Sequence, residues 1–101
     1  MATRAERKWA KFTAAMGQWA VRMNTSQPNT KIGEYCAGVY ASTQFHLGEI
    51  PLPSTYDPHS KSPWCLGFQD AAALLTAVEV AGFIPGKDFA ALLRISGSGI
   101  I

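Results

Sequence analysis

Residues 9–23 read WAKFTAAMGQWAVRM and carry the strongest periodic pattern in the chain. Bulky apolar side chains recur there at alternating steps of three and four residues: Trp9, Phe12, Met16, Trp19 and Met23. On a helix with 3.6 residues per turn, this spacing places all five in one stripe. The sequence therefore predicts an amphipathic helix over residues 3–23, whose stripe has to be covered by the core, by a partner, or by both.

The other faces of this predicted helix differ in chemistry. One face is basic, with four cations in the first dozen residues: Arg4, Arg7, Lys8 and Lys11. A flank carries small residues at helical spacing, including Ala10, Ala14 and Gly17. Close approach of another backbone along this flank would offset the cost of about 1 kcal/mol for a glycine inside a helix. We expect the chain's own core to cover one of two adjacent faces, the aromatic stripe or this flank, and a neighbour to cover the other.

Length and composition indicate one folded domain over residues 1–101. The chain has 101 residues, of which 48% are hydrophobic and 16% are charged, and this balance argues against intrinsic disorder. The formal net charge of +2 is too small to indicate a nucleic-acid-binding protein from composition. Few charges also leave less polar surface than usual, which suggests that some apolar surface meets a partner.

Residues 31–47 fit two kinds of secondary structure. Ile32, Tyr35 and Val39 lie on one face of a helix, but side chains from residue 35 to residue 47 also alternate with the period of a half-buried strand. Gly33 and Gly38 are poor residues for either structure. The helical interpretation is favoured, because a lone strand has no evident pairing partner in this chain.

Residues 48–63 are predicted to form the central loop. The segment holds four prolines, each of which removes a backbone donor and favours extended geometry in the residue before it: Pro51, Pro53, Pro58 and Pro63. A loop of this length in a small domain is often functional or in contact with a partner. The loop therefore joins two halves of one domain and offers a second contact surface.

The remaining helices are indicated by their ends. Ser62 followed by Pro63 predicts a helix start, and Asp70 is an alternative cap. Gly82 suits the left-handed residue that ends this helix. Asp88 predicts the start of a short last helix that runs through Ile95, followed by a free tail around Gly97 and Gly99.

The predicted fold class is mainly α: a small single-domain bundle of three to four helices with a Pro-rich central loop. We expect the first helix to pack on the helix formed by residues 71–81.

No frame for catalysis or metal binding is evident. The loop residues Ser54, Asp57, His59 and Ser60 include the types found in hydrolases, but turn formation explains them better. Zinc ligation would require the two cysteines and two histidines, whose spacings match no paired-ligand pattern: Cys36, His46, His59 and Cys65. We therefore expect two buried free thiols, no metal, no cofactor and no enzymatic activity.

The expected function is that of a non-catalytic protein-binding module, acting as a small subunit, adaptor or inhibitor of a larger protein assembly. The stripe residues would supply the core or the anchor, and the four basic residues an electrostatic rim: Trp9, Phe12, Met16, Trp19, Arg4, Arg7, Lys8 and Lys11. Small phage proteins that inhibit host machinery have this general character, although no residue pattern here identifies a family. The alternative is a nucleic-acid-binding accessory protein that uses the basic face.

The chain shows no secretory signal and no apolar run of the roughly 20 residues that span a bilayer. We therefore expect an intracellular, cytoplasmic protein without a transmembrane span. A mitochondrial location is the minority interpretation, because the Arg-rich and acid-poor start resembles a presequence. A basic amphipathic helix lying on an anionic membrane ranks third among the functions.

Overall fold

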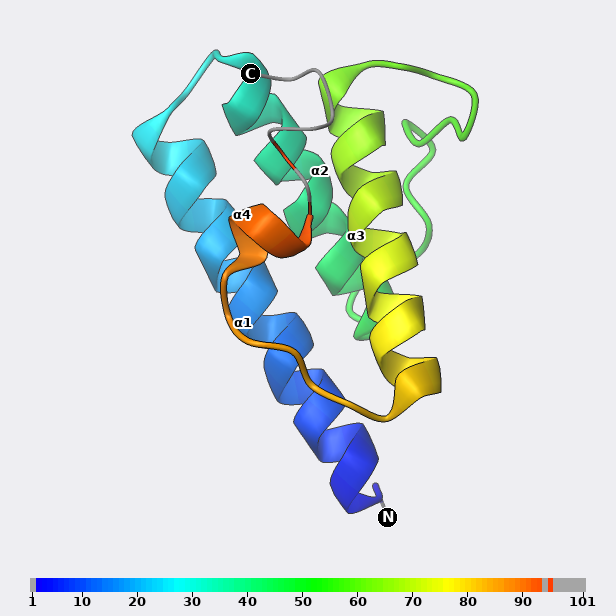
Figure 1. The fold of residues 1–101 in the computed structure, drawn as a ribbon. Helices are drawn as coiled ribbons and strands as arrows, with labels where there is room; N and C mark the ends of the chain where they lie inside the picture. Colours follow the sequence, from blue (N-terminus) through cyan, green and yellow to red (C-terminus); the bar gives the residue numbers. More distant parts are fainter. Residues whose placement is uncertain (1, 94, 96–101) are drawn as a thin grey trace.

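The computed structural model describes residues 2–93 and 95, which form four α-helices (Figure 1). Helix α1 spans Arg4–Ser26, α2 spans Lys31–His46, α3 spans Pro63–Ala81 and α4 spans Phe89–Leu92. No strand occurs within this described part of the chain. The predicted mainly α bundle is therefore confirmed, and residues 31–46 adopt the helical alternative.

Local capping explains where α1 begins. The Thr3 hydroxyl accepts a hydrogen bond from the Glu6 amide at 3.1 Å, and the Thr3 amide donates to the Glu6 carboxylate at 3.4 Å. This reciprocal pair satisfies two amides that the first helical turn leaves free. At the other end, the helix continues three residues beyond the predicted Met23, and the Asn24 side chain donates to the Gly33 carbonyl oxygen at 2.8 Å.

The predicted boundaries of α3 and α4 are mostly confirmed. Ser62 caps α3 by accepting from the Cys65 amide at 3.3 Å, and Gly82 ends it with a left-handed φ of 66°. Asp88 caps α4. The α4 helix ends at Leu92, earlier than predicted.

Two further predictions, the alternative cap at Asp70 and the free tail, are not confirmed. Asp70 is not a cap, because it lies inside α3. The predicted free tail around Gly97 and Gly99 lies outside the described residues.

Helix α2 is the main packing partner of both α1 and α3. Direct contact between α1 and α3 is limited, and Figure 1 shows α4 lying across the space between them. The predicted packing of α1 on residues 71–81 is therefore present, but it is not the main contact of α1. It holds locally, where the Trp9 indole N–H donates to the Leu75 carbonyl oxygen at 2.9 Å. The physical reason is that the small-residue flank of α1 fits α2 more closely than α3.

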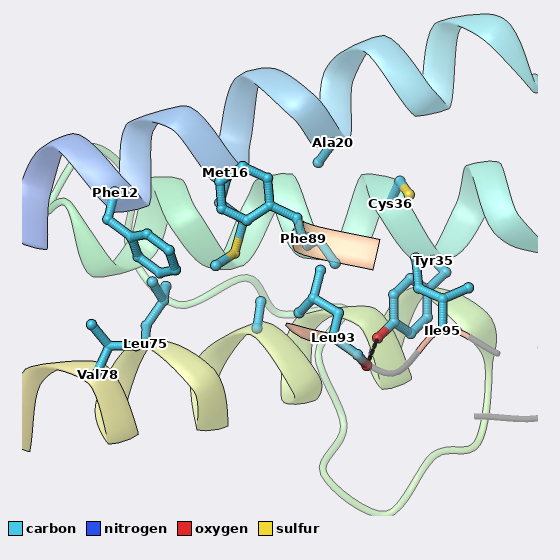
Figure 2. Close-up of a cluster of buried hydrophobic side chains, with 12 residues drawn as sticks. Phe12, Met16, Ala20, Tyr35, Cys36, Leu75, Val78, Phe89, Leu93 and Ile95 are labelled. Atoms are coloured by element: carbon cyan, nitrogen blue, oxygen red, sulfur yellow. Dashed lines mark hydrogen bonds between the residues drawn. The ribbon is translucent and has the colours of Figure 1, made fainter. Parts of the chain in front are cut away.

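The core lies where all four helices meet (Figure 2). Phe12 and Met16 point from α1 toward Leu75 of α3, and Phe89 of α4 closes the cluster. The Phe89 ring lies 5.5 Å from the Phe12 ring and 5.8 Å from the Trp19 ring, centroid to centroid, within the range of favourable aromatic pairs. The short last helix therefore covers the aromatic stripe of α1.

Helices α2 and α3 approach each other backbone to backbone. A Cβ atom added at Gly38 would lie 1.9 Å from the Trp64 carbonyl oxygen, and one added at Gly67 would lie 1.9 Å from the Tyr35 carbonyl oxygen. No other residue type fits at this separation without moving a helix. The two glycines therefore set the distance between α2 and α3.

Candidate functional site

The aromatic stripe of α1 is mainly internal. Phe12 and Met16 are 4% and 0% exposed, so neither side chain is accessible to a partner, and both belong to the core. Trp9 and Trp19 are partly buried and pack against the same cluster. This chain therefore covers the middle of the stripe fully and Trp9, Trp19 and Met23 in part, and the role of partner anchor is corrected for Phe12 and Met16.

The small-residue flank of α1 is covered by α2. A Cβ atom added at Gly17 would lie 2.7 Å from the Thr43 hydroxyl oxygen and 3.5 Å from the Tyr40 ring. The neighbour that the sequence predicts for this flank is thus another helix of the same chain. A shallow groove remains between α1 and α2, with partly exposed Val21 and Tyr40 on its walls.

The basic face of α1 is solvent-exposed. Its four cations all lie on the surface: Arg4, Arg7, Lys8 and Lys11. Their spacing places them along one side of the helix. Within the described residues, no carboxylate forms an ion pair with any of them. The charge is therefore free to act on a partner, although the same exposure is typical of an ordinary solvated helix face.

An uncharged surface runs along the outside of α3. We call it the α3 outer face, and it consists of Gln69, Ala72, Ala73, Thr76, Ala77, Val80 and Ala81. Val80 is 83% exposed, and Phe83, just beyond the end of the helix, is 70% exposed. Large apolar side chains with this degree of exposure stand out on a small protein.

Sequence reasoning missed the α3 outer face. The available signal was a helix that is apolar on more than one side, since Leu75 and Val78 face the core while Ala73, Ala77 and Val80 face solvent. Within the described residues, α3 is also the one helix long and apolar enough to cross a membrane, a property that it shares with core helices of soluble proteins. The expectation of no transmembrane span stays a prediction.

A cavity of about 570 Å³ opens at one end of the bundle, and we call it the end cavity. It lies where the first turns of α1 meet the last turns of α2 and α3. Trp9, Val78 and Ile84 contribute its apolar walls. The polar groups at its surface are those of Glu6, Lys8, His46 and Glu79.

His46 presents a defined face to the end cavity. Its Nδ1 atom lies 2.7 Å from the Ser42 carbonyl oxygen, which can only accept a hydrogen bond. In the neutral ring, Nδ1 therefore carries the proton, and Nε2 keeps a lone pair. The Phe45 ring packs edge-on against the imidazole at 5.2 Å between centroids and restricts its rotation.

The two thiols are free and buried, as the sequence predicts. Burial raises the pKa of Cys36 from 9.0 to about 11. The loop residues that resemble hydrolase types form a turn instead, in which the Asp57 carboxylate accepts from the His59 amide at 2.9 Å. Among residues 2–93 and 95, no three His, Cys, Asp or Glu side chains gather closely enough to hold a metal ion.

Tyr35 forms the one long-range hydrogen bond between two side chains among the described residues. Its hydroxyl donates to the Asp70 carboxylate at 2.5 Å and lies 3.2 Å from the Leu93 carbonyl oxygen. Burial, followed by the hydrogen bond to Asp70, raises the pKa of Tyr35 well above its usual range. The pair ties α2, α3 and the end of α4 together, so its role is structural.

Comparison with known proteins finds no match to this chain among protein-family models, curated proteins or solved structures.

Proposed function

We propose that this protein is a non-catalytic protein-binding module, a small subunit, adaptor or inhibitor that docks on a larger protein through the α3 outer face. The observation that carries the proposal is the exposure of Val80 and Phe83 beside a helix surface without charged side chains. Burying such surface against a partner releases water from apolar groups, at about 25 cal/mol per Å². The same contact would be unfavourable for a partner that presents charges.

The chemistry of the α3 outer face defines its partner. Ala73 and Ala77 lie one turn apart and have small side chains, which let a second helix approach closely. Val80 continues this face by one turn, and the exposed Phe83 follows just beyond the end of the helix, so both can supply larger apolar contact area. The partner surface is therefore an apolar helix of a larger protein, uncharged where it meets α3. A cytoplasmic location, which keeps both thiols reduced, is part of the same proposal.

Photo-crosslinking tests the docking surface directly. A benzophenone amino acid at position 80 should give an adduct with one host protein, while the same group at position 25, exposed in the last turn of α1, should not. The identified partner is then purified and its affinity measured. Val80→Asp should weaken binding at least about tenfold, as expected for an anchor residue.

Thr25→Asp is the matched control, because it also places an acid in the last turn of a helix. Equal affinity of Val80→Asp and wild type for the purified partner would refute the docking surface. If adducts form only between two copies of this chain, the α3 outer face is a self-association surface, and the proposed larger partner is wrong.

The second candidate function is nucleic-acid binding, and the observation that favours it is the row of exposed, unpaired cations on α1. If these residues contact phosphates, the affinity for a short DNA duplex should fall steeply with salt, with a log–log slope of up to about −3.6 for four contacts. Replacing Lys8 and Lys11 with glutamate should abolish that slope. A weak, salt-independent signal would leave protein docking as the better proposal.

A further inference from the structure

The end cavity combines an apolar wall with a surplus of negative charge. Trp9 forms a rigid part of the wall, because its indole N–H is held by the Leu75 carbonyl oxygen. Val78 and Ile84 complete the apolar surface. A volume of about 570 Å³ lies within the range of cavities that take small organic ligands.

Two helix C-termini border the cavity and outweigh the one helix N-terminus there, that of α1, whose first turn contributes Ala5 and Glu6. Leu47 is the C-cap of α2, Gly82 is the C-cap of α3, and both line the cavity. Each C-terminus carries the equivalent of about half a negative charge. The carboxylates of Glu6 and Glu79 add to it, whereas Lys8 is the single cationic side chain among the lining residues.

Apart from the Lys8 ammonium, the hydrogen-bonding side chains that line the cavity offer acceptors. His46 donates through Nδ1 to its own helix, so the neutral ring offers a ligand only the lone pair of Nε2. Glu79 offers carboxylate oxygens. The Trp9 indole N–H is already committed to the Leu75 carbonyl oxygen, so the indole offers a ligand apolar ring atoms and no free donor. A ligand that supplies donors and positive charge complements this set.

We propose that the end cavity is a binding site for a small organic amine, with a compact apolar body against Trp9 and Ile84 and an ammonium group that donates to Glu79 and to Nε2 of His46. The indole face adds cation–π attraction to this recognition. The site shares no residue with the α3 outer face, so it stands or fails independently of the proposed docking function.

A matched pair of probes tests the charge preference. 2-Phenylethylamine and 2-phenylethanol have the same apolar body and differ in the ammonium group. Each is titrated into the ¹⁵N-labelled protein, and the indole N–H signals of Trp9 and Trp64 are followed. The amine should shift the Trp9 signal to saturation and leave Trp64, on the first turn of α3, unchanged. The alcohol should bind at least about fivefold more weakly.

Two charge-neutralising variants complete the test. Glu79→Gln should lower the affinity for the amine about threefold, as expected for the loss of an exposed ion pair. Glu34→Gln, an equally exposed change on α2 outside the cavity, should leave the affinity unchanged. Equal affinities for the two probes, equal effects of the two variants, a Trp64 shift as large as that of Trp9, or no saturable binding of the amine would each overturn the proposal.

Discussion

Replacing Gly38 by alanine is expected to destabilise the fold by forcing α2 and α3 apart. The added methyl carbon would lie 1.9 Å from the Trp64 carbonyl oxygen, 2.8 Å from its carbonyl carbon and 2.9 Å from the Phe68 amide nitrogen. All three are backbone atoms of α3, so no side chain can rotate away to relieve the overlap. Restoring an ordinary contact of 3.4 Å requires a shift of about 1.5 Å between the two helices.

The expected magnitude follows from two opposing effects. Overpacking that displaces a backbone costs about 3 kcal/mol, at the upper end of the usual range for an inserted methyl group. Alanine recovers about 1 kcal/mol, because it is the better helix former. The net loss of unfolding free energy is about 2 kcal/mol. For a domain of this size, that loss lowers the melting temperature by about 10 °C.

The assay is urea denaturation followed by far-UV circular dichroism, with Gly86→Ala as the matched control. A Cβ atom at Gly86 meets nothing within 4 Å, so the same chemical change should be neutral or should stabilise the protein by about 0.5 kcal/mol. The reasoning is refuted if Gly38→Ala is as stable as Gly86→Ala. That result would mean that α2 and α3 do not cross at Gly38.

Three further predictions follow from hydrogen bonds and burial. Tyr35→Phe removes the hydrogen bond to Asp70 and should lower the unfolding free energy, measured by urea denaturation, by about 1.5 kcal/mol. A loss of less than about 0.3 kcal/mol would show that this hydrogen bond does not stabilise the fold. Ser62→Ala removes the α3 cap and should cost about 1 kcal/mol by the same assay. Burial raises the pKa of Cys36 to about 11, so the contribution of the thiol to stability is complete below pH 9 and is lost as the pH rises toward 11. In Cys36→Ala, the unfolding free energy should therefore fall less steeply between pH 9 and pH 11 than in the wild type.

The starts of the helices and the end of α3 were the most predictable part of this fold, because capping is local chemistry. A serine before Pro63, an aspartate at residue 88 and a glycine at residue 82 act on amides or torsions within a few residues. Tertiary packing does not have to be known to locate them. The 3.6-residue period of the Trp9 to Met23 stripe is local in the same sense, and it placed Phe12 and Met16 on the buried face of α1.

Residues 31–47 were ambiguous because the physical reason for their glycines lies on another helix. Gly38 weakens a helix by propensity alone, and nothing within residues 31–47 shows that the Trp64 carbonyl oxygen occupies the place of its Cβ atom. The contact partner is 26 positions away in the sequence and is itself a backbone atom, which no side-chain pattern encodes. The packing partner of the small-residue flank of α1 was ambiguous for the same reason. From the sequence alone, Gly17 could have packed against a helix of another protein, whereas in the structure it packs against Thr43 of α2.

The sequence placed the candidate site on α1, whereas the exposed apolar surface lies on α3, and the reason is related. Composition predicts surplus apolar surface but does not say which helix carries it, because each of these helices has a stripe that suits a core. Burial is decided by geometry: α4 covers the stripe of α1 through Phe89, whereas the described chain holds no element over the outside of α3. A helix with Leu75 facing inward and Val80 facing outward is apolar on two opposite sides, and only one of them can meet a core of this size. The exposed side of α3, rather than the tryptophans, is therefore the surface on which the proposed docking function depends.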